Sequence, residues 1–309
     1  MPHPFDSTAV RAWVALALEA VGEGREEIDA INVFPVADGD TGTNLYRTLD
    51  AAARDLEADG HGPSGSPGSP GPPLRVLARG ALLGACGNSG TILAQLLRGM
   101  AEVYGAGDGP EKDEHTGDGD RLAEALRQAA RSAYRAVAHP VEGTMLTVAG
   151  AAAAAAARAA GEEPDAVARA AYEGARTALS ETTGQLDVLR RAGVVDAGGS
   201  GLVAVLGALA DALTDPGTPL RSREILELHG PPEGGLSDVP GAAGPKGEGG
   251  PSYEVMYLLE AGDAAVAALR ERLDGLGDSL VVGGGDRLWS VHVHVDDAGA
   301  AVEAGIGAG

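Results

Sequence analysis

The stretch NVFPVADGDTGTN, residues 32–44, carries the densest set of chemical features in the chain. Asp38 and Asp40 flank Gly39 just before a helix that is predicted to begin near Thr41. The two carboxylates can converge only if the backbone turns tightly, which glycine permits. Converging carboxylates repel one another unless a cation lies between them, and their oxygens suit Mg²⁺. The helix start offers N–H groups to a phosphate, whereas the alternative interpretation is an ordinary aspartate-rich helix cap.

A second glycine-rich stretch, GACGNSG at residues 84–90, lies between two apolar segments that are predicted to be helices. Its glycines would let the backbone approach a phosphate, and Asn88 and Ser89 are expected to cap the following helix. The stretch is not a P-loop, because no Gly-Lys-Ser/Thr follows. Taken alone, the stretch is more typical of a simple turn between helices than of a phosphate-binding loop.

Two further stretches read HPVEGTML at residues 139–146 and GVVDAGGSG at residues 193–201. Each ends one predicted helix and begins another. In the first stretch Thr144 can cap the second helix, and in the second stretch an acid and a glycine cluster stand at the junction. His139 and Glu142 are interpreted as cap or surface residues. If the helices run up and down, alternate junctions fall at one end of the bundle, where the four stretches would jointly form a phosphate- and metal-binding mouth.

Helical periodicity dominates up to Leu213, and strand-like alternation is almost absent there, so an all-α bundle is predicted. Ser7 is expected to cap the first helix. The predicted helices cover residues 7–21, a segment from Thr41 through Ala52, and residues 74–85, 89–104, 120–138, 144–159, 165–179, 185–192 and 200–213.

Polar, glycine-rich segments separate these elements. Residues 60–73 and 105–119 are expected to be mobile surface loops, and residues 230–250 an interdomain linker. Strands are then predicted at residues 253–259, 279–282 and 290–295, with helices at 264–273 and 298–304, which indicates a small α/β module. This module is expected to continue past Gly309, so that the chain is a fragment or a short family member. The predicted domains are residues 7–214 and 251–309, joined by a flexible linker at 215–250.

Composition excludes several classes of function. The net charge is −22, so nucleic acid is not an expected partner. Cys86 is the only cysteine, so no intrachain disulfide is expected, and a cytoplasmic location fits this usage. The N-terminus lacks the pattern of a signal peptide. The longest apolar run, residues 149–157, is too short to span a membrane.

The four glycine-rich stretches resemble the L-subunit domain of dihydroxyacetone kinases, in the version found in bacterial fatty-acid kinases. The resemblance covers about residues 10–213 and implies an up-and-down barrel of eight helices with ATP at one end. It implies that Asp38 and Asp40 are catalytic and hold Mg²⁺. The residues implied to bind the nucleotide are Thr41, Thr43, Asn44, Gly87, Asn88, Ser89, Gly90, Thr144, Met145, Asp196 and Gly198. Dihydroxyacetone kinases carry another aspartate five residues before the first of the pair; here that position is Val33, beside Asn32.

Residues 253–309 resemble the middle domain of fatty-acid kinases, in which a cysteine and a His-x-His pair hold a metal. His292 and His294 match the pair, and the cysteine position falls near Glu254 and Val255. The two histidines are expected on one face of a strand, as two zinc ligands would be. The resemblance therefore implies Zn²⁺ at His292 and His294, and the alternative is a pair of polar histidines on a strand face.

The expected activity is phosphoryl transfer from ATP, with Mg²⁺, to an acceptor that a partner protein presents. Resemblance to fatty-acid kinases implies a fatty acid on a fatty-acid-binding protein; resemblance to dihydroxyacetone kinases implies a triose that a K-type partner protein presents. The alternative from a different class is a nucleotide-binding regulatory protein without kinase activity.

Overall fold

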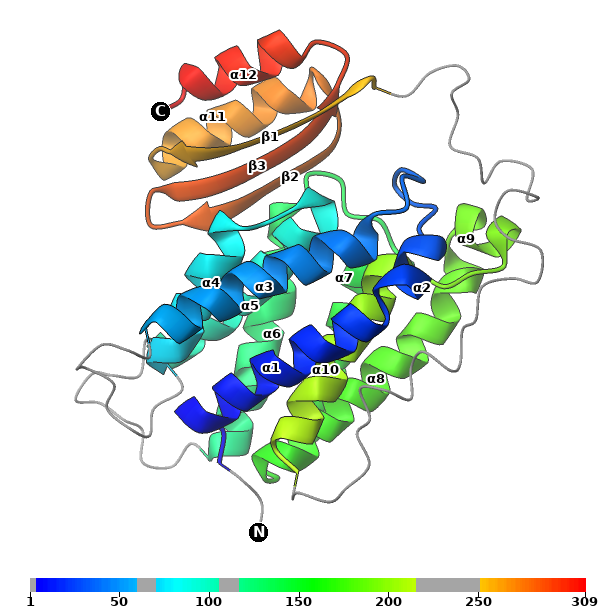
Figure 1. Cartoon of the computed structure of the whole chain (residues 1–309), viewed down its shortest axis with the longest axis vertical. Helices are drawn as coiled ribbons and strands as arrows, with labels where there is room; N and C mark the ends of the chain where they lie inside the picture. The colour runs from blue at the N-terminus through cyan, green and yellow to red at the C-terminus, as the bar shows by residue number, and fades with distance from the viewer. Residues whose placement is uncertain (1–3, 60–70, 106–116, 215–250) are drawn as a thin grey trace.

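The computed structural model describes residues 4–59, 71–105, 117–214 and 251–309 (Figure 1). The expected linker at residues 215–250 and most of the two expected loops lie outside these ranges. The helices before residue 215 are α1 (Ser7–Glu23), α2 (Arg25–Ala30), α3 (Thr41–Asp59), α4 (Gly71–Leu83), α5 (Gly87–Gly105), α6 (Asp118–Ala136), α7 (Met145–Arg158), α8 (Pro164–Gln185), α9 (Asp187–Ala192) and α10 (Ala197–Ala212).

Eight of these described helices, between 13 and 22 residues long, form a closed ring. Each long helix packs on the next one along the chain, and α10 returns to pack on α1. The indole N–H of Trp13 in α1 donates to the carbonyl oxygen of Val205 in α10 at 2.9 Å, which ties the first and last helices together. The predicted eight-helix barrel is therefore confirmed.

Small residues allow the neighbouring helices to approach closely. Gly99 of α5 lies against α6 so tightly that a Cβ at this position would stand 2.6 Å from Cα of Ala129. Leucine and alanine fill the space inside the ring, including Leu45, Leu77 and Leu122, which are completely buried. Within the described residues, every helix is too short or too polar to cross a lipid bilayer.

Several predicted boundaries were wrong. The cap of α1 is Asp6, whose carboxylate accepts from the N–H groups of Thr8 and Ala9, so Ser7 already lies inside the helix. Because α5 begins at Gly87, Asn88 and Ser89 lie in its first turn and do not precede it. Residues 71–73, expected in a loop, begin α4, and residues 118–119 begin α6. The short helix α2 was not predicted, because six residues are too few to display a helical period.

The C-terminal module is a three-stranded antiparallel sheet with two helices. Its elements are β1 (Tyr253–Glu260), α11 (Asp263–Asp274), β2 (Gly277–Gly285), β3 (Leu288–Val295) and α12 (Ala298–Ile306), and the strand order is β1-β3-β2. Helices α11 and α12 cover one face of the sheet over a core that includes Val291, Val293 and Val295 (Figure 1).

The opposite face of the sheet lies on the helical barrel, mainly against α5. Val137, just beyond the end of α6, forms an isolated β-bridge with Val281, and the N–H of Ala138 donates to the carbonyl of Leu280 at 3.0 Å. These residues were predicted to be helical, but they leave the helix to extend the sheet. The guanidinium of Arg98 in α5 also donates to the carbonyl of Gly284 in β2. The sheet module is therefore attached to the barrel both by backbone hydrogen bonds and by a side chain of the barrel.

Candidate functional site

The two aspartates of the first stretch converge across a tight turn, as predicted. Gly39 has a φ of 68°, a left-handed conformation that glycine adopts without a steric penalty. The carboxyl groups of Asp38 and Asp40 lie close enough for Asp38 to influence the ionisation of Asp40. Burial and then the neighbouring Asp38 raise the pKa of Asp40 to about 6. The two carboxylates therefore repel when both are ionised, and a cation between them would relieve that repulsion.

Asn32 completes this acidic turn. It is only 4% exposed, and its Nδ2 donates to Oδ1 of Asp38 at 2.5 Å, while its own Oδ1 is buried without a hydrogen-bond partner. Val33, in contrast, packs into the core of the barrel. The position at which dihydroxyacetone kinases carry another aspartate is thus apolar here, and the neighbouring amide contacts the acid pair instead.

Asp29 is a site residue that was not predicted from the sequence. Its carboxylate accepts from the backbone N–H of Thr43 at 3.0 Å and from the Thr43 hydroxyl at 2.7 Å. It therefore caps the first turn of α3 from the short helix α2, and its negative charge also contributes to raising the pKa of Asp40. No local motif marked Asp29, because its partner lies 14 residues away in the chain.

The first and second stretches are in direct contact. Asn44 forms a side-chain hydrogen bond with Asp40, and on its other side it lies against Gly87, where a Cβ would stand 2.4 Å from its Nδ2. The hydroxyl of Thr48 accepts from the N–H of Cys86 at 3.2 Å. The acidic turn and the turn between α4 and α5 therefore form one continuous surface.

The third and fourth stretches are joined by Asp196. Its carboxylate accepts from the N–H of Gly199 at 2.7 Å and from the N–H of Met145. One side chain therefore provides an acceptor for backbone N–H groups in the first turns of both α10 and α7. Asp196 is 5% exposed, and burial raises its pKa to about 6 against the opposing effect of these hydrogen bonds. Thr144 caps α7, as predicted, by accepting from the N–H of Leu146 at 3.4 Å.

Contact between α10 and α3 brings the two pairs of stretches together. Gly201 lies so close to Leu45 that a Cβ there would stand 2.2 Å from Cδ1 of that side chain. The N-termini of α3, α5, α7 and α10 therefore gather at one end of the barrel, as predicted from the up-and-down arrangement. Each contributes N–H groups and a positive partial charge, an arrangement suited to binding an anion.

The other residues that were predicted to bind the nucleotide also lie at this end of the barrel, and they differ in burial and in their contacts. Thr41 and Asn44 are buried in the first turn of α3, and Ser89 and Gly90 lie in the first turn of α5. The Oδ1 atom of Asn88 is buried without a hydrogen-bond partner. Gly198 packs against Met145.

The other two polar residues of the third stretch have structural partners. Glu142 accepts from the hydroxyl of Thr147 at 2.6 Å. His139 contacts Asp274 of α11 at 2.7 Å, so it helps to attach the sheet module.

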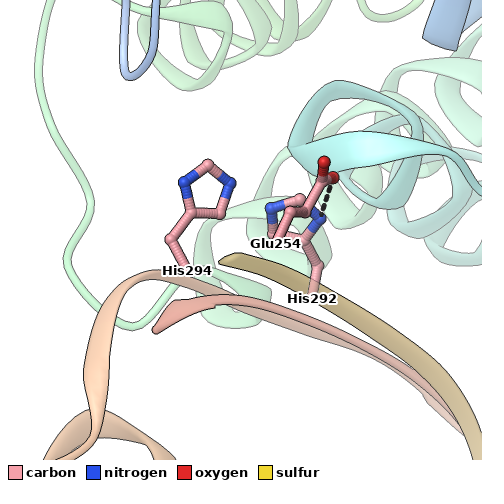
Figure 2. A group of neighbouring side chains, drawn as sticks. All are labelled: Glu254, His292 and His294. Atoms are coloured by element: carbon pink, nitrogen blue, oxygen red, sulfur yellow. Dashed lines mark ion pairs between the residues drawn. The ribbon is translucent and has the colours of Figure 1, made fainter. Parts of the chain in front are cut away.

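A second cluster lies on the sheet. Glu254 in β1 and the pair His292 and His294 in β3 project from the same face toward the helical barrel (Figure 2). Nδ1 of His292 lies 3.3 Å from Oε1 of Glu254. Burial, and secondarily His294, lower the pKa of His292 to about 3, so the ring is neutral and this contact does not join opposite charges. The predicted common face of the two histidines is confirmed, although both are buried and neither lies on a solvated strand face.

Known proteins resemble the chain over both of its parts. Residues 35–211 match the DAK2 domain family, and residues 250–309 match the middle domain of proteins that are like fatty acid kinase. Protein YloV of Bacillus subtilis (strain 168) is 33% identical over 309 aligned residues, which cover 96% of this chain and 52% of YloV. Uncharacterized proteins of Staphylococcus saprophyticus and Staphylococcus haemolyticus are 32% and 33% identical, each over 88% of this chain and 48% of the relative. The chain thus spans about half the length of these curated relatives.

Proposed function

Because the chain belongs to the DAK2 domain family, a kinase family, we propose that it is an ATP- and Mg²⁺-dependent phosphotransferase. The nucleotide-binding domain is proposed to be residues 7–214, and residues 251–309 a partial middle domain. The observation that carries the proposal is the gathering of four helix N-termini around the turn that holds Asp38 and Asp40.

The helix N-termini are proposed to bind the phosphates of ATP. Thr41, Thr43 and Asn44 would contribute from α3, and Gly87, Asn88, Ser89 and Gly90 from α5. On the other side of the mouth, Thr144 and Met145 would contribute from the cap and first turn of α7, and Asp196 and Gly198 from the cap and first turn of α10. The buried, unpartnered Oδ1 of Asn88 supports this assignment, because a buried polar atom without a partner is uncommon unless a ligand or water completes it.

Asp38 and Asp40 are proposed to hold Mg²⁺. The fit rests on the proximity of their carboxylates and on the unpartnered Oδ1 of Asn32, which supplies a neutral oxygen beside them. When bound, the cation would neutralise charge on the transferring phosphoryl group. The role of the chain itself is to orient Asp38 through Asn32 and to fix the start of α3 through Asp29, so that the acid pair does not need to reorganise.

The proposed acceptor is a carboxylate, a fatty acid carried by a fatty-acid-binding partner. A carboxylate oxygen would attack the γ-phosphorus of ATP while the bond to the β,γ-bridging oxygen breaks, giving an acyl phosphate and ADP. A fatty acid is already ionised near neutral pH, so this acceptor needs no general base. Catalysis would then consist of positioning ATP and the acceptor and of neutralising charge on the transferred phosphoryl group. The helix N-termini and the acid pair at this end of the barrel are suited to both tasks.

The match to a fatty acid kinase-like middle domain favours this acceptor over a triose that a K-type partner presents. The test is a radiolabelled-ATP assay of the full chain with free fatty acid, free dihydroxyacetone, and each fatty-acid-binding carrier in turn. Transfer only with a loaded carrier is the expected result. Robust turnover of either free acceptor would contradict the need for a partner. Failure with every carrier, despite Mg²⁺-dependent ATP binding, would favour a nucleotide-binding regulatory protein.

A further inference from the structure

Thr43 lies in the first turn of α3, on the same side of the helix as Asp40. The N–H of Asn44 donates to the carbonyl of Asp40 at 2.8 Å, so Asp40 stands at the start of the helix, three positions before Thr43. Residues at this spacing are neighbours on a helix surface. Asp29, which contacts Thr43 from α2, is also near enough for its charge to act on Asp40. The half-buried side chain of Thr43 therefore lies beside the acid pair.

Both hydrogen-bond donors of Thr43 are used by Asp29. The backbone N–H donates to Oδ1 of Asp29 at 3.0 Å, and the hydroxyl donates to Oδ2 at 2.7 Å. A threonine has one N–H and one O–H, and its hydroxyl oxygen also carries two lone pairs. With both protons committed to one carboxylate, Thr43 has no hydrogen left for a phosphate oxygen. It presents only a neutral oxygen that accepts.

Helix capping explains one of these two bonds. An N–H in the first turn of a helix has no partner within the helix, so its bond to Asp29 satisfies an otherwise unpaired group. The hydroxyl of a half-buried threonine has no such need, because water can bond to it. The second bond therefore fixes the direction of the hydroxyl proton, which capping alone does not require.

Asn32 shows the same pattern beside Asp38. Its Nδ2 donates to Oδ1 of Asp38 at 2.5 Å, whereas its own Oδ1 is buried without a hydrogen-bond partner in a residue that is 4% exposed. A buried oxygen without a partner is uncommon unless a ligand or water completes it. Two neutral side chains thus donate to the carboxylates around this turn and keep their oxygens free. Such an arrangement suits a cation that prefers oxygen ligands, and it does not suit a bare phosphate, which needs donors.

We propose that Asp29 is a positioning residue for the phosphotransfer: by accepting both donors of Thr43, it makes the Thr43 hydroxyl an oxygen ligand for the Mg²⁺ of the nucleotide instead of a donor to its phosphates. The inference rests on the nucleotide site proposed above and narrows the role of Thr43 within it. Asp29 would thereby favour the nucleotide with its cation over the free nucleotide, because a metal-free triphosphate meets acceptors at this position and is repelled by the carboxylates.

The test compares ATP binding to the full chain with and without Mg²⁺ by calorimetry. Thr43→Val keeps the shape of the side chain and removes its oxygen. It should weaken Mg²⁺-dependent binding by about 10–100-fold and leave Mg²⁺-free binding unchanged. Thr43→Ser keeps the oxygen and both donors and should bind like the wild type. Thr177→Val is the matched control, because the hydroxyl of this exposed threonine in α8 donates to the carbonyl of Glu173 at 2.9 Å, away from the site.

A double-mutant cycle separates the charge of Asp29 from its action through Thr43. Asp29→Asn keeps an oxygen for the N–H of Thr43 but places an amide nitrogen opposite the hydroxyl, so the hydroxyl oxygen must accept from that amide. The substitution should lower Mg²⁺-dependent affinity more in the wild type than in Thr43→Val, where only the loss of charge remains. Additive losses would contradict the positioning role of Asp29.

Two further results would overturn the proposal. Thr43→Val that loses ATP affinity equally with and without Mg²⁺ would make the hydroxyl a phosphate donor, and Thr43→Val with wild-type affinity would make it purely structural. Thermal unfolding checks each fold, and Thr43→Ala replaces Thr43→Val if the latter unfolds. Mn²⁺ titration without nucleotide, followed by electron paramagnetic resonance, should also show weaker binding in Thr43→Val. A wild type that binds Mn²⁺ but not ATP would contradict the proposed function, and the Mn²⁺ comparison would then decide the role of Thr43.

Discussion

Asn44 and Gly87 meet at the centre of the proposed nucleotide site, where a Cβ at position 87 would lie 2.4 Å from Nδ2 of Asn44. Gly87 also has a φ of 60°, a conformation that other residues adopt at a cost. These two residues join the acidic turn to the start of α5, so their contact fixes the relative positions of two of the four glycine-rich stretches.

Gly87→Ala should therefore destabilise the chain by about 2–4 kcal/mol, from left-handed strain and displacement of Asn44. Urea denaturation measures the loss. Gly150→Ala is the matched control, because Gly150 lies in the exposed interior of α7 with nothing near its Cβ position, and it should stabilise the chain by about 0.5–1 kcal/mol. Equal effects of the two substitutions would contradict the packing account.

Asn32→Ala should weaken Mg²⁺-dependent ATP binding while the chain stays folded. The substitution removes the hydrogen bond that orients Asp38 and the oxygen proposed to face the cation. Asn32→Asp should instead raise the affinity for Mg²⁺, because ligand charge increases cation affinity. Calorimetric titration of each variant at several Mg²⁺ concentrations makes the comparison. If Asn32→Ala binds like the wild type, Asn32 has no part in the site.

Asp196 should make stability depend on pH. Its pKa rises from an ordinary 3.8 to about 6 in the folded chain, so folding favours its protonated form. The resulting stabilisation is fully present below about pH 4 and is lost as the pH rises through about 6, a change on the order of 2–3 kcal/mol. Asp196→Asn keeps an oxygen acceptor for Gly199 and cannot ionise, so its stability relative to the wild type should increase between pH 4 and pH 7. Thermal unfolding across this range is the measurement, and a constant difference would contradict the assignment.

Arg270 should hold the sheet module on the barrel. Its guanidinium donates to the carbonyl of Arg135 at 2.9 Å and to the carbonyl of Val282, and burial lowers its pKa. Arg270→Ala should therefore speed hydrogen exchange in β2 and at residues 137–138, with a loss of about 1–3 kcal/mol for the hydrogen bonds of a charged donor. Arg272→Ala, two residues away on the exposed side of α11, is the control and should leave exchange unchanged.

Most of the fold was predictable because the periodic signals are local. The strands and the eight long helices follow from patterns within each segment, and the common end of the bundle follows from chain connectivity. Asp29 and the contact of Asn32 with Asp38 were not predictable, since they depend on how α2 sets the chain before α3. The contact of Glu254 with His292 was not predictable either, because it depends on the strand register, which places Glu254 opposite His294, 40 residues later in the chain.

The most direct test of the central claim is calorimetric titration of ATP into the full chain with and without Mg²⁺, repeated with the Asp38→Asn, Asp40→Asn double variant. The wild type should bind ATP tightly only with Mg²⁺, since the ionised pair otherwise repels the triphosphate. The variant should remain folded and lose the Mg²⁺ effect, by more than the roughly 10–100-fold that loss of a group supporting a metal ligand costs. Mg²⁺-dependent binding of wild-type strength in the variant would contradict the proposed site.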